Sequence, residues 1–178
     1  ANSKGGDSAV DFDGANDYAR TRKKYNLTNF TLCAWVRWDA GESAAAAVII
    51  SNYSAGGSDS WFSIYMTAAD VLEFAFDDGT TNDVATGTTE LDDGSWHFVV
   101  VVFDSTNAIA RVYVDGLQEG TNDPLGESGV TSTNYLYVGT DTTLAQKWNG
   151  AIDEARLYSR ALTAAEIYFL YEHPDGHA

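Results

Sequence analysis

Short apolar segments with a two-residue repeat follow one another along almost the whole chain, and this pattern limits the fold more than any other feature. In LCAWVRW, residues 32–38, Leu32 and every second residue after it face one side of an extended strand, while Cys33 and its alternates face the other. Polar clusters such as SAGGSDS and DDGTTND separate the segments and are typical of turns. Roughly a dozen short strands with turns between them predict an all-β fold, an antiparallel two-sheet β-sandwich.

Two segments indicate more than strand formation. WHFVVVVF, residues 96–103, is apolar on both faces, which is typical of a central strand in a stack of two layers. The segment ARVYV ends at Asp115-Gly116, and LQEG follows directly. This arrangement predicts a β-hairpin with a tight turn.

A single short helix is predicted near the end of the chain, at residues 163–171. Thr163 and Glu166 have the spacing of a capping box, in which each side chain accepts a hydrogen bond from the backbone N–H of the other residue. Ile167, Leu170 and Tyr171 then supply an apolar stripe at helical spacing. We expect this helix to cover an open edge or end of the sandwich.

The length and composition fit one domain. The 178 residues are 44% hydrophobic, which is enough for a sizeable core, and no apolar run approaches the ~20 residues of a membrane helix. No linker is visible before about residue 172, so residues 1–172 are predicted to form a single domain and 173–178 a C-terminal tail. Cys33 is the only cysteine, which excludes an internal disulfide and predicts a buried, inert thiol.

The charge balance is strongly acidic, with 26 acidic and 10 basic residues and a formal net charge of −16. This balance argues against nucleic acid as a partner, because phosphate contacts need lysine and arginine. Three interpretations of the acidic residues stay open: a solvated surface, carboxylates that hold a cation, and adaptation to strong brine.

Several segments together resemble a known family. VDFDGANDYA, FTLCAWVRW, GSWHFVVVVFD, ARVYVDG, YLYVG and GAIDEARLYSRALTAAEI occur in this order between residues 9 and 171. The ordered set resembles the laminin-G-like domains of the concanavalin A-like lectin/glucanase superfamily. The resemblance implies a jelly roll of two antiparallel sheets, usually one module of a larger secreted or cell-surface protein. It also implies binding of glycans or proteins, and in many members a calcium ion.

Acidic side chains occur near both ends of the chain. Asp13 and Asp17 lie in DFDGANDY, where Gly14 allows a tight turn that can bring oxygen atoms together. A carboxylate at Asp153 needs a partner if it faces the interior, because burying it unpaired costs several kcal/mol. Calcium prefers six to eight oxygen ligands of this kind.

In the resembled family, the first and last strands lie close together, often with calcium between them. The resemblance therefore implies a Ca²⁺ site, with these ligands: Asp13, Asn16, Asp17, the carbonyl of Gly150, and Asp153. Glu154 is expected to pair with Arg156 on the same strand face. The alternative is an ordinary polar turn together with a salt bridge.

Catalysis is not supported by the sequence, although some members of the superfamily are hydrolases or lyases. The Glu-x-Asp-x-Glu and Glu-x-Asp-x-x-Glu patterns of the related glucanases do not occur. Glu73 and Asp77 lie on one strand face but are too far apart for the paired carboxylates of retaining hydrolysis. We therefore predict no catalytic residues.

Aromatic residues beside turns are the predicted binding groups, because the apolar faces of sugars stack on exposed rings. The segment NYSAGGSDSW is the strongest candidate, since Tyr53 and Trp61 enclose a Gly-Gly turn. The full set of predicted ligand-binding residues is Trp38, Asn52, Tyr53, Asp59, Trp61 and Trp148.

The sequence thus predicts a calcium-binding, non-catalytic carbohydrate-binding or adhesion module. The first alternative is a structural or protein–protein interaction domain of a surface protein, and the second is a polysaccharide hydrolase or lyase. The expected partner is a glycan or a cell-surface protein, with no nucleic acid and no insertion into a membrane. We expect an extracellular location and a monomeric domain within a multidomain parent.

Overall fold

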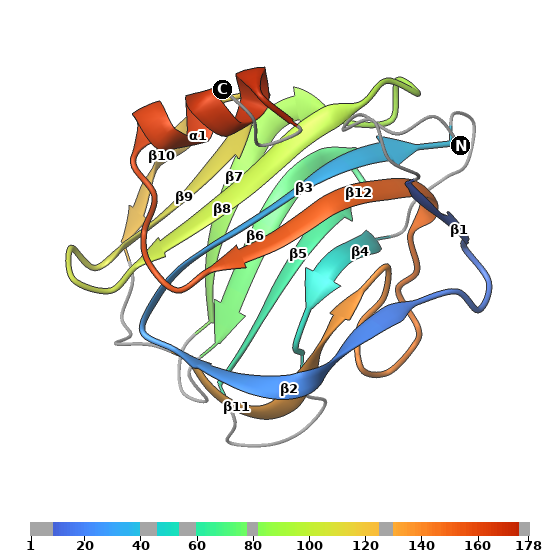
Figure 1. Cartoon of the computed structure of the whole chain (residues 1–178), viewed down its shortest axis with the longest axis horizontal. Coiled ribbons are helices and arrows are strands. Elements are labelled where there is room, and N and C mark those ends of the chain that lie inside the picture. Colours follow the sequence, from blue (N-terminus) through green and yellow to red (C-terminus); the bar gives the residue numbers. More distant parts are fainter. Residues whose placement is uncertain (1–8, 40–45, 54–59, 78–81, 125–129, 175–178) are drawn as a thin grey trace.

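The computed structural model describes residues 9–39, 46–53, 60–77, 82–124 and 130–174. Two antiparallel sheets of six strands each pack face to face, with one short helix near the end of the chain (Figure 1). The predicted two-sheet β-sandwich is therefore confirmed. No helix within these ranges is both long enough and apolar enough to cross a bilayer.

Sheet A consists, in spatial order, of β1 (Val10–Asp13), β12 (Asn149–Tyr158), β3 (Asn29–Trp38), β8 (His97–Asp104), β9 (Ile109–Val114) and β10 (Leu117–Pro124). Sheet B consists of β2 (Ala19–Leu27), β11 (Val130–Val138), β4 (Ala46–Ser51), β5 (Trp61–Thr67), β6 (Val71–Asp77) and β7 (Asn82–Glu90). First and last strands of the chain lie side by side, as the resemblance implied, with Val10 opposite Ile152.

The core between the sheets is rich in aromatic side chains. Phe30 of β3 stacks on Phe103 of β8 with ring centroids 5.0 Å apart, and Phe76 of sheet B lies 4.5 Å from Phe103. Fully burying each such ring stabilises the fold by about 1.5–3 kcal/mol. The alternation predicted for residues 32–38 is confirmed, because Leu32 faces this core while Cys33 and Trp35 face the opposite side of sheet A.

Helix α1 (Ala164–Glu172) begins with the predicted capping box, in which Thr163 Oγ1 accepts from Glu166 N and Glu166 Oε2 accepts from Thr163 N. Its expected position was wrong. The helix covers the outer face of sheet A rather than an edge or end of the sandwich (Figure 1). Ile167 is fully buried, and Tyr171 stacks on Trp35 with ring centroids 5.7 Å apart. This cover explains why β8 is apolar on both faces.

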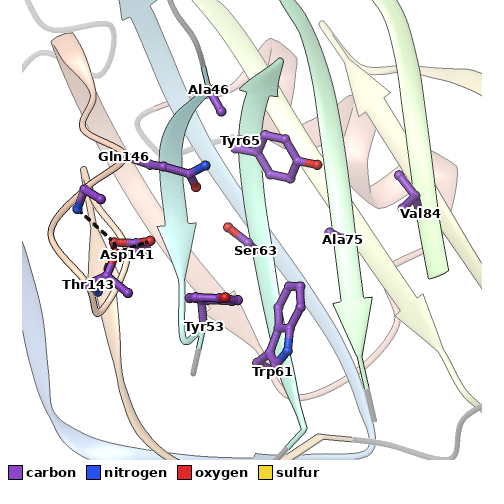
Figure 2. Close-up of a pocket in the computed structure, with 11 residues that line it drawn as sticks. Ala46, Tyr53, Trp61, Ser63, Tyr65, Ala75, Val84, Asp141, Thr143 and Gln146 are labelled. Atoms are coloured by element: carbon purple, nitrogen blue, oxygen red, sulfur yellow. Dashed lines mark hydrogen bonds between the residues drawn. The ribbon is translucent and has the colours of Figure 1, made fainter. Parts of the chain in front are cut away.

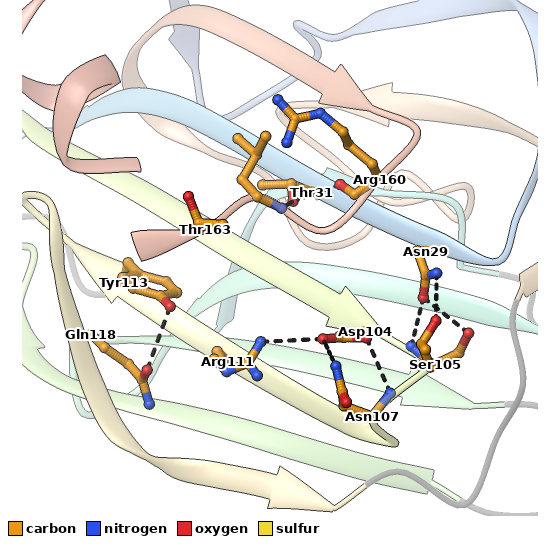
Figure 3. A network of polar contacts seen from close by, with 12 residues as sticks. Asn29, Thr31, Asp104, Ser105, Asn107, Arg111, Tyr113, Gln118, Arg160 and Thr163 are labelled. Atoms are coloured by element: carbon orange, nitrogen blue, oxygen red, sulfur yellow. Dashed lines mark hydrogen bonds and ion pairs between the residues drawn. The ribbon is translucent and has the colours of Figure 1, made fainter. Parts of the chain in front are cut away.

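Buried and half-buried polar groups fix the approach to the helix and the turn after β8. Thr31 Oγ1 donates to the carbonyl oxygen of Arg160 and accepts from Leu162 N, both at 2.9 Å (Figure 3). At the β8–β9 turn, Asp104 accepts from the backbone and side-chain N–H groups of Asn107. Burial alone would raise the pKa of Asp104, but these hydrogen bonds and the nearby Arg111 lower it overall.

Strand β7 was not predicted, because its sequence, NDVATGTTE, is rich in residues typical of turns. It pairs with β6 along one side, where Phe74 lies opposite Ala85. Glu119 of β10 also binds it from the other sheet, accepting from Thr88 N at 2.7 Å and Thr89 N at 3.1 Å. These bonds join the two sheets at this side of the sandwich.

A histidine between two carboxylates holds the β9–β10 turn against the start of β8. His97 Nδ1 lies 2.9 Å from Asp115 Oδ2, and His97 Nε2 lies 3.2 Å from Asp93 Oδ1. Asp115 Oδ1 also accepts from Phe98 N. The hydrogen bond to Asp115 raises the pKa of His97 against the opposing effect of burial, with a smaller contribution from Asp93.

Because the folded-state pKa of His97 is raised, the stabilisation is complete below the unfolded value of about 6.5 and is lost as pH rises through the folded value. We expect His97→Gln to lower the free energy of unfolding by about 2 kcal/mol at pH 5.5 and by less at pH 9. Denaturant titrations of both proteins at the two pH values measure this difference. An equal loss at both values would contradict an imidazolium between the two carboxylates.

Candidate functional site

A pocket of about 510 Å³ opens on the outer face of sheet B, the face turned away from sheet A (Figure 2). Strands β4 to β7 form its floor, and the loop between β11 and β12 forms one wall. The residues that line it are Ala46, Tyr53, Trp61, Ser63, Tyr65, Ala75, Val84, Asp141, Thr143, Ala145 and Gln146.

The floor follows from strand alternation. Phe62, the residue after Trp61, points into the core, so Trp61, Ser63 and Tyr65 point outward along β5. The register places Ala75 of β6 directly opposite Ser63. Small side chains in the middle of the floor and aromatic rings at both ends leave a hollow that a flat ring can enter.

Tyr53 and Trp61 form an aromatic pair at one end of the pocket. Their ring centroids are 4.7 Å apart and their planes are 79° apart, and both residues are partly exposed. The backbone of Tyr53 is fixed on both sides, since its N–H donates to Ser51 Oγ at 2.9 Å and its carbonyl oxygen accepts from Thr142 Oγ1 at 2.6 Å. The pair is therefore a prearranged platform.

Asp141 organises the loop that forms the wall. Its side chain is buried, and Oδ1 accepts from Thr143 N at 3.0 Å and Ala145 N at 3.2 Å. The hydroxyl of Thr143 also donates to the Asp141 carboxylate at 2.8 Å. The loop places Gln146 at the rim, facing across the floor toward Tyr65 (Figure 2).

A second carboxylate lies beside the pocket. The hydroxyl of Tyr65 donates to Glu73 Oε1, and Thr86 Oγ1 donates to Glu73 Oε2 at 3.3 Å. Burial raises the pKa of the Glu73 carboxyl, and the hydrogen bond from Thr86 opposes this change. These contacts fix the orientation of the Tyr65 ring.

The predicted ligand-binding residues divide into three groups. Tyr53 and Trp61 line the pocket. The predicted exposure of Trp38 and Trp148 was wrong, and Asn52, which was predicted to bind the ligand, is buried as well. The two tryptophans pack edge to face in the core, with centroids 5.0 Å apart, and the buried Asn52 accepts from Phe62 N at 2.7 Å to hold β4 against β5. Asp59 lies outside the described residues.

Nine of the eleven lining residues were missed by the sequence analysis, and five of these are polar: Ser63, Tyr65, Asp141, Thr143 and Gln146. Alternation from Trp61 is a signal that identifies Ser63 and Tyr65, because every second residue of a strand shares a face. The other three lie 80 or more residues away in the chain, and only the tertiary fold brings them to Trp61.

The predicted calcium ligands are not brought together. Asp13 of β1 lies opposite Asn149 of β12. Asp153 is four residues further along β12 than Asn149, which corresponds to roughly 13 Å at the rise per residue of a strand. A single ion with ligand distances of ~2.3–2.6 Å cannot contact both carboxylates. Within the described ranges, no three His, Cys, Asp or Glu residues are grouped as a metal site.

A local structure accounts for the acidic pair in β12. The register with β3 shifts between Asp153 and Arg156, and Glu154 has a positive φ of 51°. Asp153 Oδ1 accepts from Glu154 N at 2.9 Å. The predicted ion pair between Glu154 and Arg156 is confirmed, and Arg156 also donates to the carbonyl oxygen of Pro174.

Asp13, Asn16 and Asp17 do share one exposed turn. Asp13 Oδ1 accepts from Ala15 N at 2.8 Å and Asn16 N at 3.1 Å, and these bonds lower the pKa of the Asp13 carboxyl. Asp17 Oδ2 accepts from Asp13 N. Calcium binding stays a prediction, now restricted to this turn.

If this turn binds calcium in the folded protein but not in the unfolded chain, calcium raises the free energy of unfolding. The increase is about 2.7 kcal/mol when the free calcium concentration is ~100 times the dissociation constant of the site. We expect Asp13→Asn to abolish the difference in melting temperature between calcium and chelator. Asp153→Asn, the matched control, should leave it unchanged. Identical melting curves of the unmodified protein in calcium and in chelator would contradict a calcium site.

Fold and pocket together define a lectin-like β-sandwich domain with a concave site on one sheet face. A family model, Laminin_G_3, described as "Concanavalin A-like lectin/glucanases superfamily", matches residues 13–168. The chain belongs to this family.

Individual similarities are more distant. The chain is 24% identical to neuronal pentraxin-1 of Rattus norvegicus over 164 residues, which is 86% of this chain and 36% of that protein. The chain therefore spans about a third of the length of this relative.

The CBM40 module of the Ruminococcus gnavus IT-sialidase, bound to α2,3-sialyllactose, has a TM-score of 0.76 at 15% identity, covering 93% of this chain and 97% of that one. A candidate carbohydrate-binding protein of Bacteroides ovatus has a TM-score of 0.70 at 19% identity, covering 90% and 45%. At these identities, both structures show a shared fold.

Proposed function

We propose that the domain binds carbohydrate in the pocket on the outer face of sheet B and catalyses no reaction there. The observation that carries this proposal is the Tyr53–Trp61 pair at the end of a polar hollow. Sugar rings have apolar C–H patches that pack on aromatic faces, while their hydroxyls need hydrogen-bond partners. Gln146, Thr143 and Tyr65 supply such partners around the same hollow.

The fold supports the same conclusion. A CBM40 module with this architecture holds sialyllactose, so a sandwich of this kind can serve as a glycan-binding module. A prearranged floor on rigid strands and a wall on a well-bonded loop keep the entropic cost of binding low. An extracellular location, a monomeric state and a place in a multidomain parent remain predictions from the family resemblance.

Affinity at one pocket should be weak. One aromatic contact and a few hydroxyl bonds leave a small surplus after the cost of association, so the dissociation constant should be about micromolar to millimolar. Repetition of the module in a parent protein would then supply avidity.

A glycan array tests the proposal. The chain is displayed as a biotin–streptavidin tetramer, in calcium and in chelator, and we expect retention on a defined subset of glycans. Retention in calcium but not in chelator would show that glycan binding requires the ion. Equal retention in both would show that glycan binding does not require a metal. Binding to no glycan, together with capture of a surface protein, would favour the protein–protein interaction alternative.

A further inference from the structure

We infer that the pocket accepts uncharged saccharides and rejects those that carry a carboxylate, sulfate or phosphate group. This inference rests on the proposed function and specifies its ligand class. It follows from the charges around the pocket and from the direction of the hydrogen bonds within it.

Positive charge is missing from the pocket. None of the described residues that line it is lysine, arginine or histidine. No lysine or arginine occurs anywhere between Arg37 and Arg111, a span that includes strands β4 to β7 and the sequence segments that connect them. Lys147 lies in the wall loop next to Gln146 but does not line the pocket, and its Nζ donates to the carbonyl oxygen of Leu144 at 2.6 Å. An anionic sugar would therefore find no base at the floor of the site.

Negative charge is present on two sides. Asp141 lines the pocket from the wall loop. Glu73 and Asp77 lie two residues before and after Ala75 on β6, so all three share the outer face of the sheet. An anion in the hollow would approach these carboxylates in a partly desolvated site, where repulsion between like charges is stronger than in water.

Two of the four hydroxyl groups that line the pocket are oriented as acceptors. Thr143 donates its proton to Asp141, and Tyr65 donates its proton to Glu73. A hydroxyl has one proton to donate, so these oxygens offer only lone pairs to a ligand. Sugar hydroxyls can donate to lone pairs, whereas an ionised carboxylate or sulfate can only accept. At these two positions the hydrogen-bond pattern favours the same ligands as the charge does, while Gln146 and the hydroxyls of Tyr53 and Ser63 can also donate.

Matched glycan pairs test the inference: lactose against α2,3-sialyllactose, and methyl-esterified against free polygalacturonate, at low salt. Only the signal lost in Trp61→Ala is assigned to the pocket, so binding elsewhere on the surface does not contribute. We expect the neutral member of a recognised pair to bind at least tenfold more tightly, with a smaller ratio in 0.5 M salt.

A variant that adds a positive charge at the pocket tests the same inference from the opposite direction. Val84 lines the pocket from β7 and is 40% exposed, so Val84→Lys adds a base at the rim without entering the core. We expect it to reduce the preference for neutral glycans at least threefold, while the matched Val84→Gln retains it. Trp61-dependent binding of the acidic members that equals or exceeds that of the neutral members would overturn the inference and leave the proposed function intact. No Trp61-dependent binding to any glycan would instead contradict the proposed function.

Discussion

Trp61→Ala should abolish retention of the domain on its glycan while leaving the melting temperature within a few degrees of the unmodified value. The ring lies on the outer face of β5, partly exposed, and its neighbour Tyr53 has its backbone fixed by hydrogen bonds independent of Trp61. Loss of one aromatic platform costs about 1.5–2 kcal/mol of binding free energy, or more than tenfold in affinity. A ligand held at micromolar to millimolar affinity is then no longer retained.

Tyr168→Ala is the matched control for this experiment. Tyr168 is an aromatic residue on α1, more exposed than Trp61 and on the opposite side of the molecule from the pocket. Affinity chromatography and thermal melts on both variants separate binding from folding. Unchanged retention of folded Trp61→Ala would place the glycan site elsewhere, and an unfolded Trp61→Ala would show that the ring belongs to the core.

Gly150→Ala should destabilise the domain by about 4 kcal/mol or more, which exceeds the effect of most single substitutions. Gly150 has a φ of +135°, and it lies in the sheet between Phe12 of β1 and Trp38 of β3. A Cβ atom here would overlap the backbone carbonyl oxygen of Arg37 and lie 3.0 Å from Asp39 N. Because these are backbone atoms of a neighbouring strand, no side-chain rotation relieves the overlap.

Gly14→Ala separates steric overlap from the cost of a positive φ. Gly14 also has a positive φ of 69°, but its nearest neighbour is the partly exposed side chain of Asn149 at 3.1 Å, which can move. We expect a loss of about 1–2 kcal/mol in this variant. Denaturant unfolding of both variants gives the comparison, and similar losses would show that backbone strain rather than contact with β3 makes glycine necessary at position 150.

The positions of strands, turns and the helix could be predicted where the sequence pattern is local. The alternation in β3, the Asp115-Gly116 hairpin and the capping box of α1 each depend on residues close together in the chain. Strand β7 could not be predicted, because polar and glycine residues form a strand there only through pairing with β6 and the bonds from Glu119. The helix was predicted, but the face that it covers depends on residues more than 50 positions away, such as Trp35 and Tyr113.

Part of the pocket could also be predicted. Tyr53 and Trp61 were identified from their place beside a turn, and that signal was correct because both residues project from the outer face of sheet B. The same signal was wrong for Trp38 and Trp148, because a turn in the sequence does not show whether the loop folds back over the residue. Trp148 ends such a loop and is fully buried against Trp38. Asp141 reaches the site through its hydrogen bonds to Thr143 and Ala145, which no spacing in the sequence indicates.

Helix α1 determines where this module can be separated from any longer polypeptide. The side of sheet A beneath the helix is formed by apolar residues such as Trp35, Phe98 and Val100, and Ile167 completes their burial. A fragment that ends after β12 would keep every strand but leave this sheet face open to water, and apolar faces of that kind promote aggregation. A soluble recombinant fragment should therefore extend at least through Glu172.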